Sequence, residues 1–184
     1  MRILEKALLV IDYTYDFVAE DGALTCGQPG IDLEDYITDL TRKFLDDGEL
    51  VIIPVDVHEK DDSFHPETKL FPPHNIRGTQ GRELFGTLHT LYEERKNEIL
   101  WIDKTRYSAF TGTDLELQLR ARGIKELHLV GVCTDICILH TSVDAYNKGF
   151  DIVVHEKGVA SFNPAGHEWA LGHFENSLGA TVIR

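Results

Sequence analysis

Short apolar runs that alternate with amphipathic stretches constrain the fold of this chain more than any other feature. Six runs rich in leucine and β-branched residues are expected to form buried strands over 7–11, 50–55, 98–102, 126–130, 151–154 and 181–183. Between them, apolar residues at three- and four-residue spacing predict helices over 33–45, 82–95, 114–122, 137–148 and 165–177. Several of these helices are expected to end at a left-handed glycine, at Gly48, Gly123, Gly149 and Gly179. The alternation predicts an α/β fold of three layers, α/β/α, with a mostly parallel six-stranded sheet covered on both faces.

Length and charge narrow the class of protein. The chain has 184 residues and 42% hydrophobic content, and a domain of about 150 residues already buries roughly 70% of its unfolded surface. We therefore expect a single domain over residues 1–184. The 31 acidic and 18 basic residues give a formal charge of −13, which repels a polyanion. Nucleic acid is accordingly not an expected partner.

Cysteine content and hydropathy bear on the cellular environment. Three cysteines, without an apolar targeting segment at the N-terminus, fit a reducing compartment better than a disulfide framework. No apolar run approaches the roughly 20 residues that a membrane-spanning helix needs. We expect a cytoplasmic protein that takes a small-molecule substrate and has no membrane partner. Exposed apolar patches on such sheets often support association, so we also expect a homo-oligomer.

Reactive residue types stand at the carboxyl ends of the predicted strands, where ligands bind in open α/β sheets. Asp12 follows the first strand, Asp56 and His58 the second, and Lys104 the third, and the segment 133–137 follows the fourth. The segment 56–81 is long and irregular, and loops of more than about 12 to 15 residues usually carry function. The sequence therefore places the chemistry at this edge of the sheet.

Cys137 is the leading candidate for a nucleophile. It begins a predicted helix, where unpaired N–H groups favour the thiolate. A thiol that attacks a carbonyl carbon also needs a base, an acid and oxyanion donors. Asp12 could be both base and acid if burial raises its pKa toward neutrality, with Lys104 balancing the charge. The residues alone leave the alternative open that Cys137 is an inert buried thiol, Asp12 caps a turn and Lys104 is solvated.

A second group of side chains has the composition of a metal site. Two imidazoles and two carboxylates suit Zn²⁺, Fe²⁺ or Mn²⁺ and leave room for water ligands. With no thiolate among them, the site should be open rather than structural. The alternative is a solvated acidic loop that holds no metal. The four candidate ligands are Asp56, His58, Glu67 and His74.

Three separated segments carry a resemblance to a known family. Ile11-Asp12, the segment 104–110 (KTRYSAF) and the segment 131–137 (GVCTDIC) each stand at the end of a predicted strand. In this order they resemble the isochorismatase-like cysteine hydrolases and, within them, the nicotinamidases, also called pyrazinamidases. The resemblance runs from about residue 7 to residue 183. It implies the isochorismatase-like hydrolase fold and a catalytic triad of Asp12, Lys104 and Cys137.

The resemblance has two further implications. The backbone N–H groups of Cys133 and Cys137 would form an oxyanion hole, and a cis peptide bond would join Val132 to Cys133. Three segments of this chain look like the metal motifs of nicotinamidases: 56–58 (DVH), 71–74 (FPPH) and 78–81 (GTQG). The chain departs from the commonest pattern at four positions. Val57 and Phe71 stand where tryptophan is frequent, Asn75 where cysteine is frequent, and Cys133 where alanine is usual.

A flat aromatic substrate would need stacking partners, and the candidates are Phe17, Phe71 and Tyr107. Plain core packing is an equally open interpretation of Phe17. A pyridine nitrogen is a good ligand for a borderline metal, so an open coordination position could anchor such a ring.

The resulting hypothesis is a nicotinamidase that converts nicotinamide and water to nicotinate and ammonia through a thioester on Cys137, in NAD salvage. One divalent ion is expected, Zn²⁺ first, with Fe²⁺ or Mn²⁺ as alternatives. Two other functions stay open. One is hydrolysis of another small amide or N-carbamoyl compound by the same fold. The other is a thiol-redox or metal-binding protein in which Cys133 and Cys137 form a disulfide.

Overall fold

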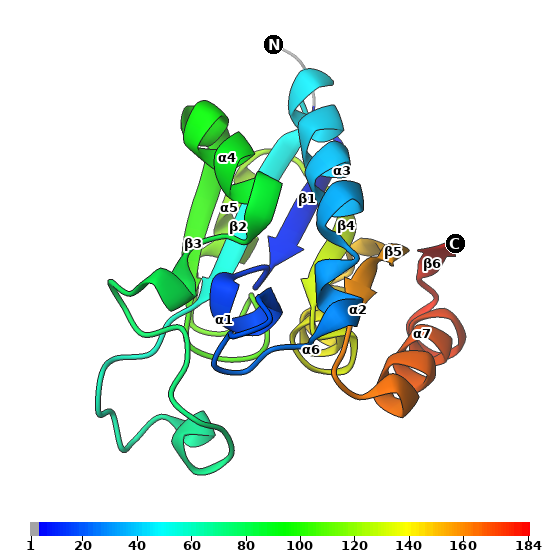
Figure 1. Ribbon diagram of the computed structural model, residues 1–184. Coiled ribbons are helices and arrows are strands. Elements are labelled where there is room, and N and C mark those ends of the chain that lie inside the picture. Colours follow the sequence, from blue (N-terminus) through cyan, green and yellow to red (C-terminus); the bar gives the residue numbers. More distant parts are fainter. Residues whose placement is uncertain (1–3) are drawn as a thin grey trace.

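The computed structural model describes residues 4–184, which form a six-stranded sheet with helices on both faces (Figure 1). Every pair of neighbouring strands is parallel, in the order β3-β2-β1-β4-β5-β6. The predicted α/β architecture is therefore confirmed. The strands are β1 (Lys6–Ile11), β2 (Leu50–Asp56), β3 (Ile99–Lys104), β4 (Glu126–Val132), β5 (Asp151–Ala160) and β6 (Thr181–Ile183).

Two apolar cores lie on opposite faces of the sheet, because successive side chains of a strand point to opposite sides. In β1, Ala7, Leu9 and Ile11 join one core, whereas Leu8 and Val10 join the other. The first core is covered by α5 (Leu115–Ala121), α6 (Leu139–Asn147) and α7 (Pro164–Leu178). The second is covered by α1 (Tyr15–Val18), α2 (Gln28–Ile31), α3 (Glu34–Asp46) and α4 (Gly86–Arg95).

The short helices α1 and α2 were not predicted, and three further differences from the predicted elements are larger than a shift of one or two residues at an end. β5 continues to Ala160, six residues past its predicted end, because a register shift against β4 interrupts the apolar pattern. The predicted helix 82–95 begins only at Gly86, after a short 3₁₀ turn. A π-helical turn, Thr134–Ile138, precedes α6, so Cys137 lies in this turn and not in α6 itself. The four predicted left-handed glycines all have positive φ.

One further glycine sets the spacing of the central strands where the site lies. Gly131, near the end of β4, has a φ of 121°. A Cβ atom at this position would lie 1.9 Å from the backbone oxygen of Ile11 in β1. Only glycine therefore lets the ends of these two strands approach this closely.

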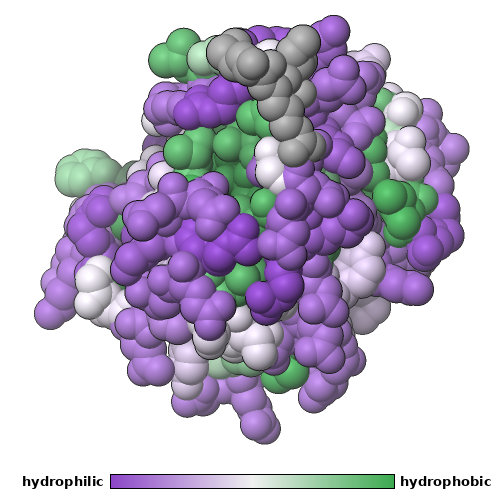
Figure 2. Space-filling view, turned by 90° about the horizontal axis from the view of Figure 1, so that it is seen from above, coloured by the Kyte–Doolittle hydropathy of each residue, from purple (hydrophilic) through white to green (hydrophobic). Residues whose placement is uncertain are grey.

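The two ends of the sheet differ in character. Figure 2 views the molecule from the amino ends of the strands, and this face is largely hydrophilic, with an apolar area near its centre and smaller ones toward its edges. At the opposite end, the long loop 57–81 projects beyond the carboxyl ends of the strands (Figure 1). Within residues 4–184, none of the helices has the length and apolar character that crossing a bilayer would require.

Candidate active site and metal centre

Asp12, Lys104 and Cys137 meet at the carboxyl end of the sheet. The Nζ atom of Lys104 lies 2.7 Å from Oδ2 of Asp12 and 3.6 Å from Sγ of Cys137. All three residues are buried, with exposed fractions of 0%, 1% and 7% for Asp12, Lys104 and Cys137. The structure thus brings together three residues that are separated by 92 and 33 positions in the sequence.

The strand order explains this convergence. β1 lies between β2 and β4, so its end is next to the ends of both neighbours. Asp12 has a φ of 56° directly after β1, in a left-handed conformation that aspartate tolerates better than most residues. Its Oδ1 atom accepts a hydrogen bond of 2.7 Å from the backbone N–H of Asp56 at the end of β2. Lys104 ends β3, one strand further out, and its long side chain reaches the same point.

Burial controls the protonation of this group. It raises the pKa of Asp12, against the opposing effect of Lys104. Burial also raises the pKa of the Cys137 thiol well above its ordinary value, although Lys104 favours the thiolate. For Lys104, burial is outweighed by the negative charges around it, Asp12 first, and its pKa is raised. Burial therefore opposes the predicted bias of Cys137 toward the thiolate, and the thiol needs a base such as Asp12 to take its proton.

The turn that carries Cys137 is fixed by hydrogen bonds to its own backbone and to α7. The peptide bond between Val132 and Cys133 is cis, as expected. The backbone oxygen of Cys133 accepts hydrogen bonds of 3.1 Å from the N–H groups of Ile136 and Ile138.

Two residues that sequence reasoning missed tie the same turn to the β5–α7 region. The hydroxyl of Ser161 donates to Asp135 at 2.7 Å, and His167 Nδ1 lies 2.8 Å from the hydroxyl of Thr134. Both partners are polar residues distant in sequence, and no motif singles them out.

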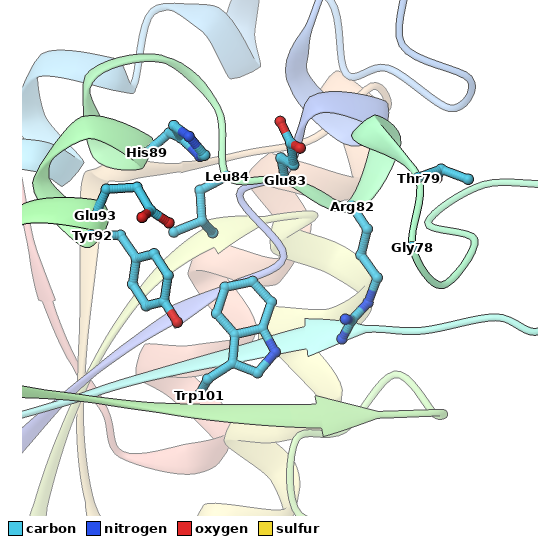
Figure 3. A pocket seen from close by; sticks show the side chains of 9 residues that line it. All are labelled: Gly78, Thr79, Arg82, Glu83, Leu84, His89, Tyr92, Glu93 and Trp101. Atoms are coloured by element: carbon cyan, nitrogen blue, oxygen red, sulfur yellow. The ribbon is translucent and has the colours of Figure 1, made fainter. Parts of the chain in front are cut away.

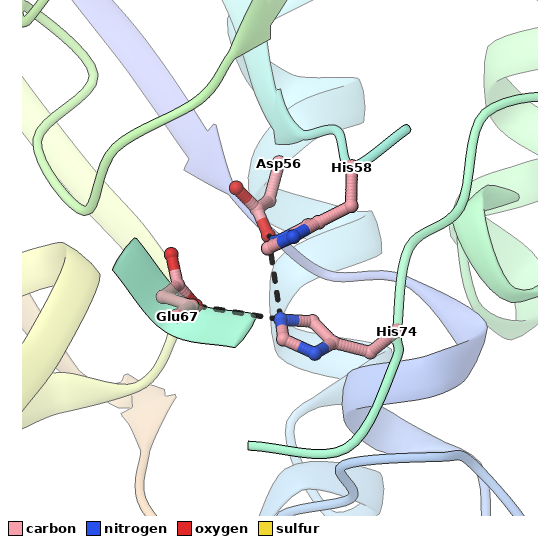
Figure 4. Close-up of side chains that lie close together, drawn as sticks. All are labelled: Asp56, His58, Glu67 and His74. Carbon is pink, nitrogen blue, oxygen red and sulfur yellow. Dashed lines mark hydrogen bonds and ion pairs between the residues drawn. The ribbon is translucent and has the colours of Figure 1, made fainter. Parts of the chain in front are cut away.

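The four candidate metal ligands converge beside the triad (Figure 4). Asp56 ends β2, His58 follows it, and Glu67 and His74 come from the long loop. One ligand atom of each residue lies within 4.8 Å of those of the other three. Nε2 of His74 lies 3.5 Å from Asp56 Oδ2 and 3.4 Å from Glu67 Oε2, and His58 Nε2 lies 2.7 Å from Asp56 Oδ2.

These residues fit a divalent cation. Among residues 4–184, the buried atoms Nε2 of His74 and Oδ1 of Asp56 form no hydrogen bond and have only ion-pair contacts of 3.4–3.9 Å, and buried polar atoms without a hydrogen bond are costly. The two carboxylates raise the pKa of His74 to about 10 although burial opposes it. Its Nδ1 atom lies 2.7 Å from the backbone oxygen of Pro72, which leaves Nε2 directed at the cluster. A buried site that holds two carboxylates calls for positive charge, and mixed N/O ligands suit a first-row ion.

His65 supports this cluster, although it was not a predicted site residue. Its ring packs against His58 with the ring centres 4.1 Å apart. Both ring nitrogens have partners, since Nε2 lies 2.8 Å from the backbone oxygen of Thr105 and Nδ1 accepts the N–H of Glu67. The ring therefore positions Glu67 and leaves no nitrogen free for a metal.

Two cavities flank the metal cluster. A cavity of about 20 Å³ lies at Cys137, and its wall includes the three predicted stacking residues, Phe17, Phe71 and Tyr107. Leu24 and Phe162 also line it, and neither was predicted. A larger cavity of about 700 Å³ lies inside the long loop and is lined by His58, Glu67 and His74. Glu67 belongs to both walls, so the cluster lies between the nucleophile and the loop interior.

A third cavity, of about 320 Å³, lies apart from the triad at the β3 edge (Figure 3). Arg82 crosses this region, with its guanidinium 5.5 Å from the ring centre of Trp101. It forms an ion pair with Asp103 and donates to the backbone oxygen of Asp56 at 2.9 Å. The two last residues of β3 therefore point to different places. Asp103 pairs with arginines at the sheet edge, whereas Lys104 contacts Asp12 in the triad.

The chain belongs to the isochorismatase family, because the isochorismatase domain profile matches residues 6–184. It is 61% identical over 181 residues to the "Uncharacterized isochorismatase family protein PncA" of Bacillus subtilis strain 168, covering 97% of this chain and 99% of that protein. The crystal structure of nicotinamidase/pyrazinamidase PncA from B. subtilis superposes with a TM-score of 0.96 at 62% identity, covering 98% of this chain and 100% of that one.

Two other solved structures are similar. Pyrazinamidase/nicotinamidase from Streptococcus mutans is 51% identical, with a TM-score of 0.95 over 97% of this chain and 100% of that chain. Pyrazinamidase of Pyrococcus horikoshii, solved in complex with zinc, is 29% identical, with a TM-score of 0.86 over 98% of this chain and 99% of that chain.

Proposed function

We propose that this protein is a nicotinamidase, which hydrolyses nicotinamide to nicotinate and ammonia through a thioester on Cys137 and acts in NAD salvage. One observation carries the proposal: a buried lysine contacts both an aspartate, at 2.7 Å, and a cysteine, at 3.6 Å, next to a buried Asp-His-Glu-His cluster. The nicotinamidase and pyrazinamidase structures that resemble this chain support the choice of substrate.

In the proposed reaction each residue of the triad and the oxyanion hole has a separate role. Asp12, whose pKa burial raises, accepts the proton of the Cys137 thiol as the sulfur attacks the amide carbon. Lys104 stabilises the negative charge on both groups. The backbone N–H groups of Cys133 and Cys137 stabilise the oxyanion of the tetrahedral intermediate. Asp12 then gives its proton to the departing ammonia and later deprotonates the water that cleaves the thioester.

Asp56, His58, Glu67 and His74 would hold one divalent ion, and zinc in the P. horikoshii structure favours Zn²⁺ over Fe²⁺ or Mn²⁺. The ion would supply a coordination position for the pyridine nitrogen and so orient the carboxamide toward the sulfur.

Ring binding also requires room that the cavity at Cys137 lacks. Its volume of about 20 Å³ admits a molecule of the size of water. Phe17, Phe71 and Tyr107 line this cavity and would stack on a flat ring. Phe162 is 45% exposed in the same wall. We expect substrate to enter by displacing the side chain of Phe71 or Phe162.

An ammonia-release assay tests the proposal. Purified enzyme loaded with zinc should release ammonia from nicotinamide, and Cys137→Ala should abolish the release. Cys26→Ala, a change of the same size at a buried thiol outside the triad, is the matched control and should keep turnover. Full activity in Cys137→Ala, or activity toward N-carbamoyl compounds alone, would overturn the assignment.

A further inference from the structure

Cys26 has no role in the proposed reaction, yet its thiol contacts the segment that carries the oxyanion donors. Its Sγ atom lies 3.3 Å from Sγ of Cys133, across 107 positions of sequence. Both thiols are buried, at 4% and 7% exposed. The sequence suggested Cys137 as the disulfide partner of Cys133, whereas the structure gives Cys133 the thiol of Cys26 as its neighbour.

The separation of the two sulfurs is small compared with the adjustment that a disulfide needs. A disulfide bond is about 2.05 Å long, so the sulfurs must approach by roughly 1.2 Å. Rotation about the side-chain bonds and a small backbone shift can provide this. Cys26 lies in the segment between α1 and α2, and its N–H donates a hydrogen bond of 2.8 Å to the backbone oxygen of Phe17. A bond to Cys133 would therefore join the wall that holds Phe17 to the oxyanion segment.

The cavity at Cys137 gives a small oxidant access to one thiol of the pair, Cys133. Cys133 lines this cavity together with Cys137. The volume of about 20 Å³ admits a molecule of about the size of water, and hydrogen peroxide is only slightly larger. Cys133 is thus the thiol that meets the oxidant, and Cys26 is the thiol that resolves the product.

We propose that Cys26 and Cys133 form an oxidative modification site at which a hydroperoxide produces a reversible disulfide. In the first step, Cys133 takes one oxygen from the hydroperoxide and becomes a sulfenic acid, and the hydroperoxide is reduced to an alcohol or to water. In the second step, the sulfur of Cys26 attacks this sulfenic sulfur, the S–S bond forms, and the hydroxyl leaves as water with the proton of Cys26. The two thiols supply the two electrons that the peroxide takes up.

The effect on turnover rests on the proposed function. The N–H of Cys133 is an oxyanion donor in that mechanism, and catalytic groups lose about a hundredfold in rate when displaced by 1 Å. The disulfide should lower turnover by at least tenfold. The hydrogen bond between the two thiols, together with burial, raises the pKa of Cys133. The pair therefore oxidises more slowly than an exposed thiolate and responds to sustained exposure.

Disulfide formation can be measured without any assay of activity. The chain has three free cysteines, so Cys137→Ala leaves only Cys26 and Cys133. After treatment of the folded variant with hydrogen peroxide, thiol titration should fall from two to zero, and peptide mapping should find residues 26 and 133 linked within one chain. Two surviving thiols, or sulfinic acid at Cys133 without a link, would overturn the proposal.

Turnover provides the second arm. Wild-type enzyme treated with peroxide should lose at least tenfold in turnover and recover it with dithiothreitol. Cys26→Ser should have the basal turnover of wild type. Under sustained peroxide its unresolved Cys133 sulfenic acid should take a second oxygen and become sulfinic acid, so the turnover it loses should not return with dithiothreitol. Because the link is measured in Cys137→Ala, a failed nicotinamidase assignment leaves that result intact. A wild-type link that leaves turnover unchanged would refute the effect on catalysis.

Discussion

Lys104→Met should nearly abolish turnover while preserving the shape of the buried site. The ammonium lies 3.6 Å from the sulfur of Cys137. At an effective dielectric constant of about 20, the attraction between two unit charges at this distance is about 4.6 kcal/mol. Each 1.36 kcal/mol is a factor of ten in rate. Removal of the charge should therefore lower kcat on the order of a thousandfold.

The same substitution should also change stability and pH dependence. It leaves Asp12 buried without its counter-ion at 2.7 Å, and breaking a buried pair typically costs about 3–5 kcal/mol in the free energy of unfolding. The thiol of Cys137 becomes harder to ionise, so the residual turnover should rise with pH across the alkaline range.

Lys148→Met is the matched control, because Nζ of Lys148 also lies 2.7 Å from a carboxylate, Glu116, but near the surface. It should cost about 0–1 kcal/mol in stability and leave kcat unchanged. The assays are ammonia release for kcat and urea unfolding for stability. A folded Lys104→Met enzyme with kcat within tenfold of wild type would refute the electrostatic role of this lysine.

Three further predictions concern the metal cluster and the central strands. The pKa of His74 is raised from 6.5 to about 10 in metal-free protein. Protonated His74 therefore stabilises the folded state fully below pH 6.5, and this contribution is lost as pH rises through 10. Urea unfolding of metal-free protein at several pH values should show this loss. If the free energy of unfolding of His74→Gln fell with pH as steeply as that of wild type, the prediction would be contradicted. In metal-loaded protein, His74→Gln should lower the zinc content after dialysis, which elemental analysis measures. Gly131→Ala should destabilise the fold by on the order of 3 kcal/mol, since its Cβ meets the backbone of β1 at 1.9 Å. Gly172→Ala in α7, where a Cβ meets nothing closer than 3.9 Å, should instead add about 0.5–1 kcal/mol, and equal Tm values for the two variants would contradict the argument.

Much of the fold was predictable because apolar runs report burial directly. β1 and β2 are almost entirely buried, and their runs are unbroken in the sequence. The end of β5 was not predictable, because the bulge against β4 inserts polar residues into the strand. The meeting of Asp12, Lys104 and Cys137 was predictable in outline, because carboxyl ends of parallel strands lie on one edge of the sheet.

Other properties of the site depend on the packed structure and have no local signal. The protonation of Cys137 is one, because burial within the folded core raises the pKa of its thiol. The contact between Cys26 and Cys133 is another, because a single cysteine in an irregular segment gives no indication of its neighbour. The supporting role of His65 was not predictable for a similar reason, because both of its ring nitrogens form hydrogen bonds with backbone atoms.

The thioester on Cys137 is the centre of this account, and rapid acid quenching followed by mass spectrometry tests it most directly. During turnover of nicotinamide, a nicotinoyl group should be found on the peptide that contains Cys137, and it should disappear as substrate is exhausted. Lys104→Met should show little of this adduct. Ammonia release without any acyl group on Cys137, or with the group on another residue, would contradict the account.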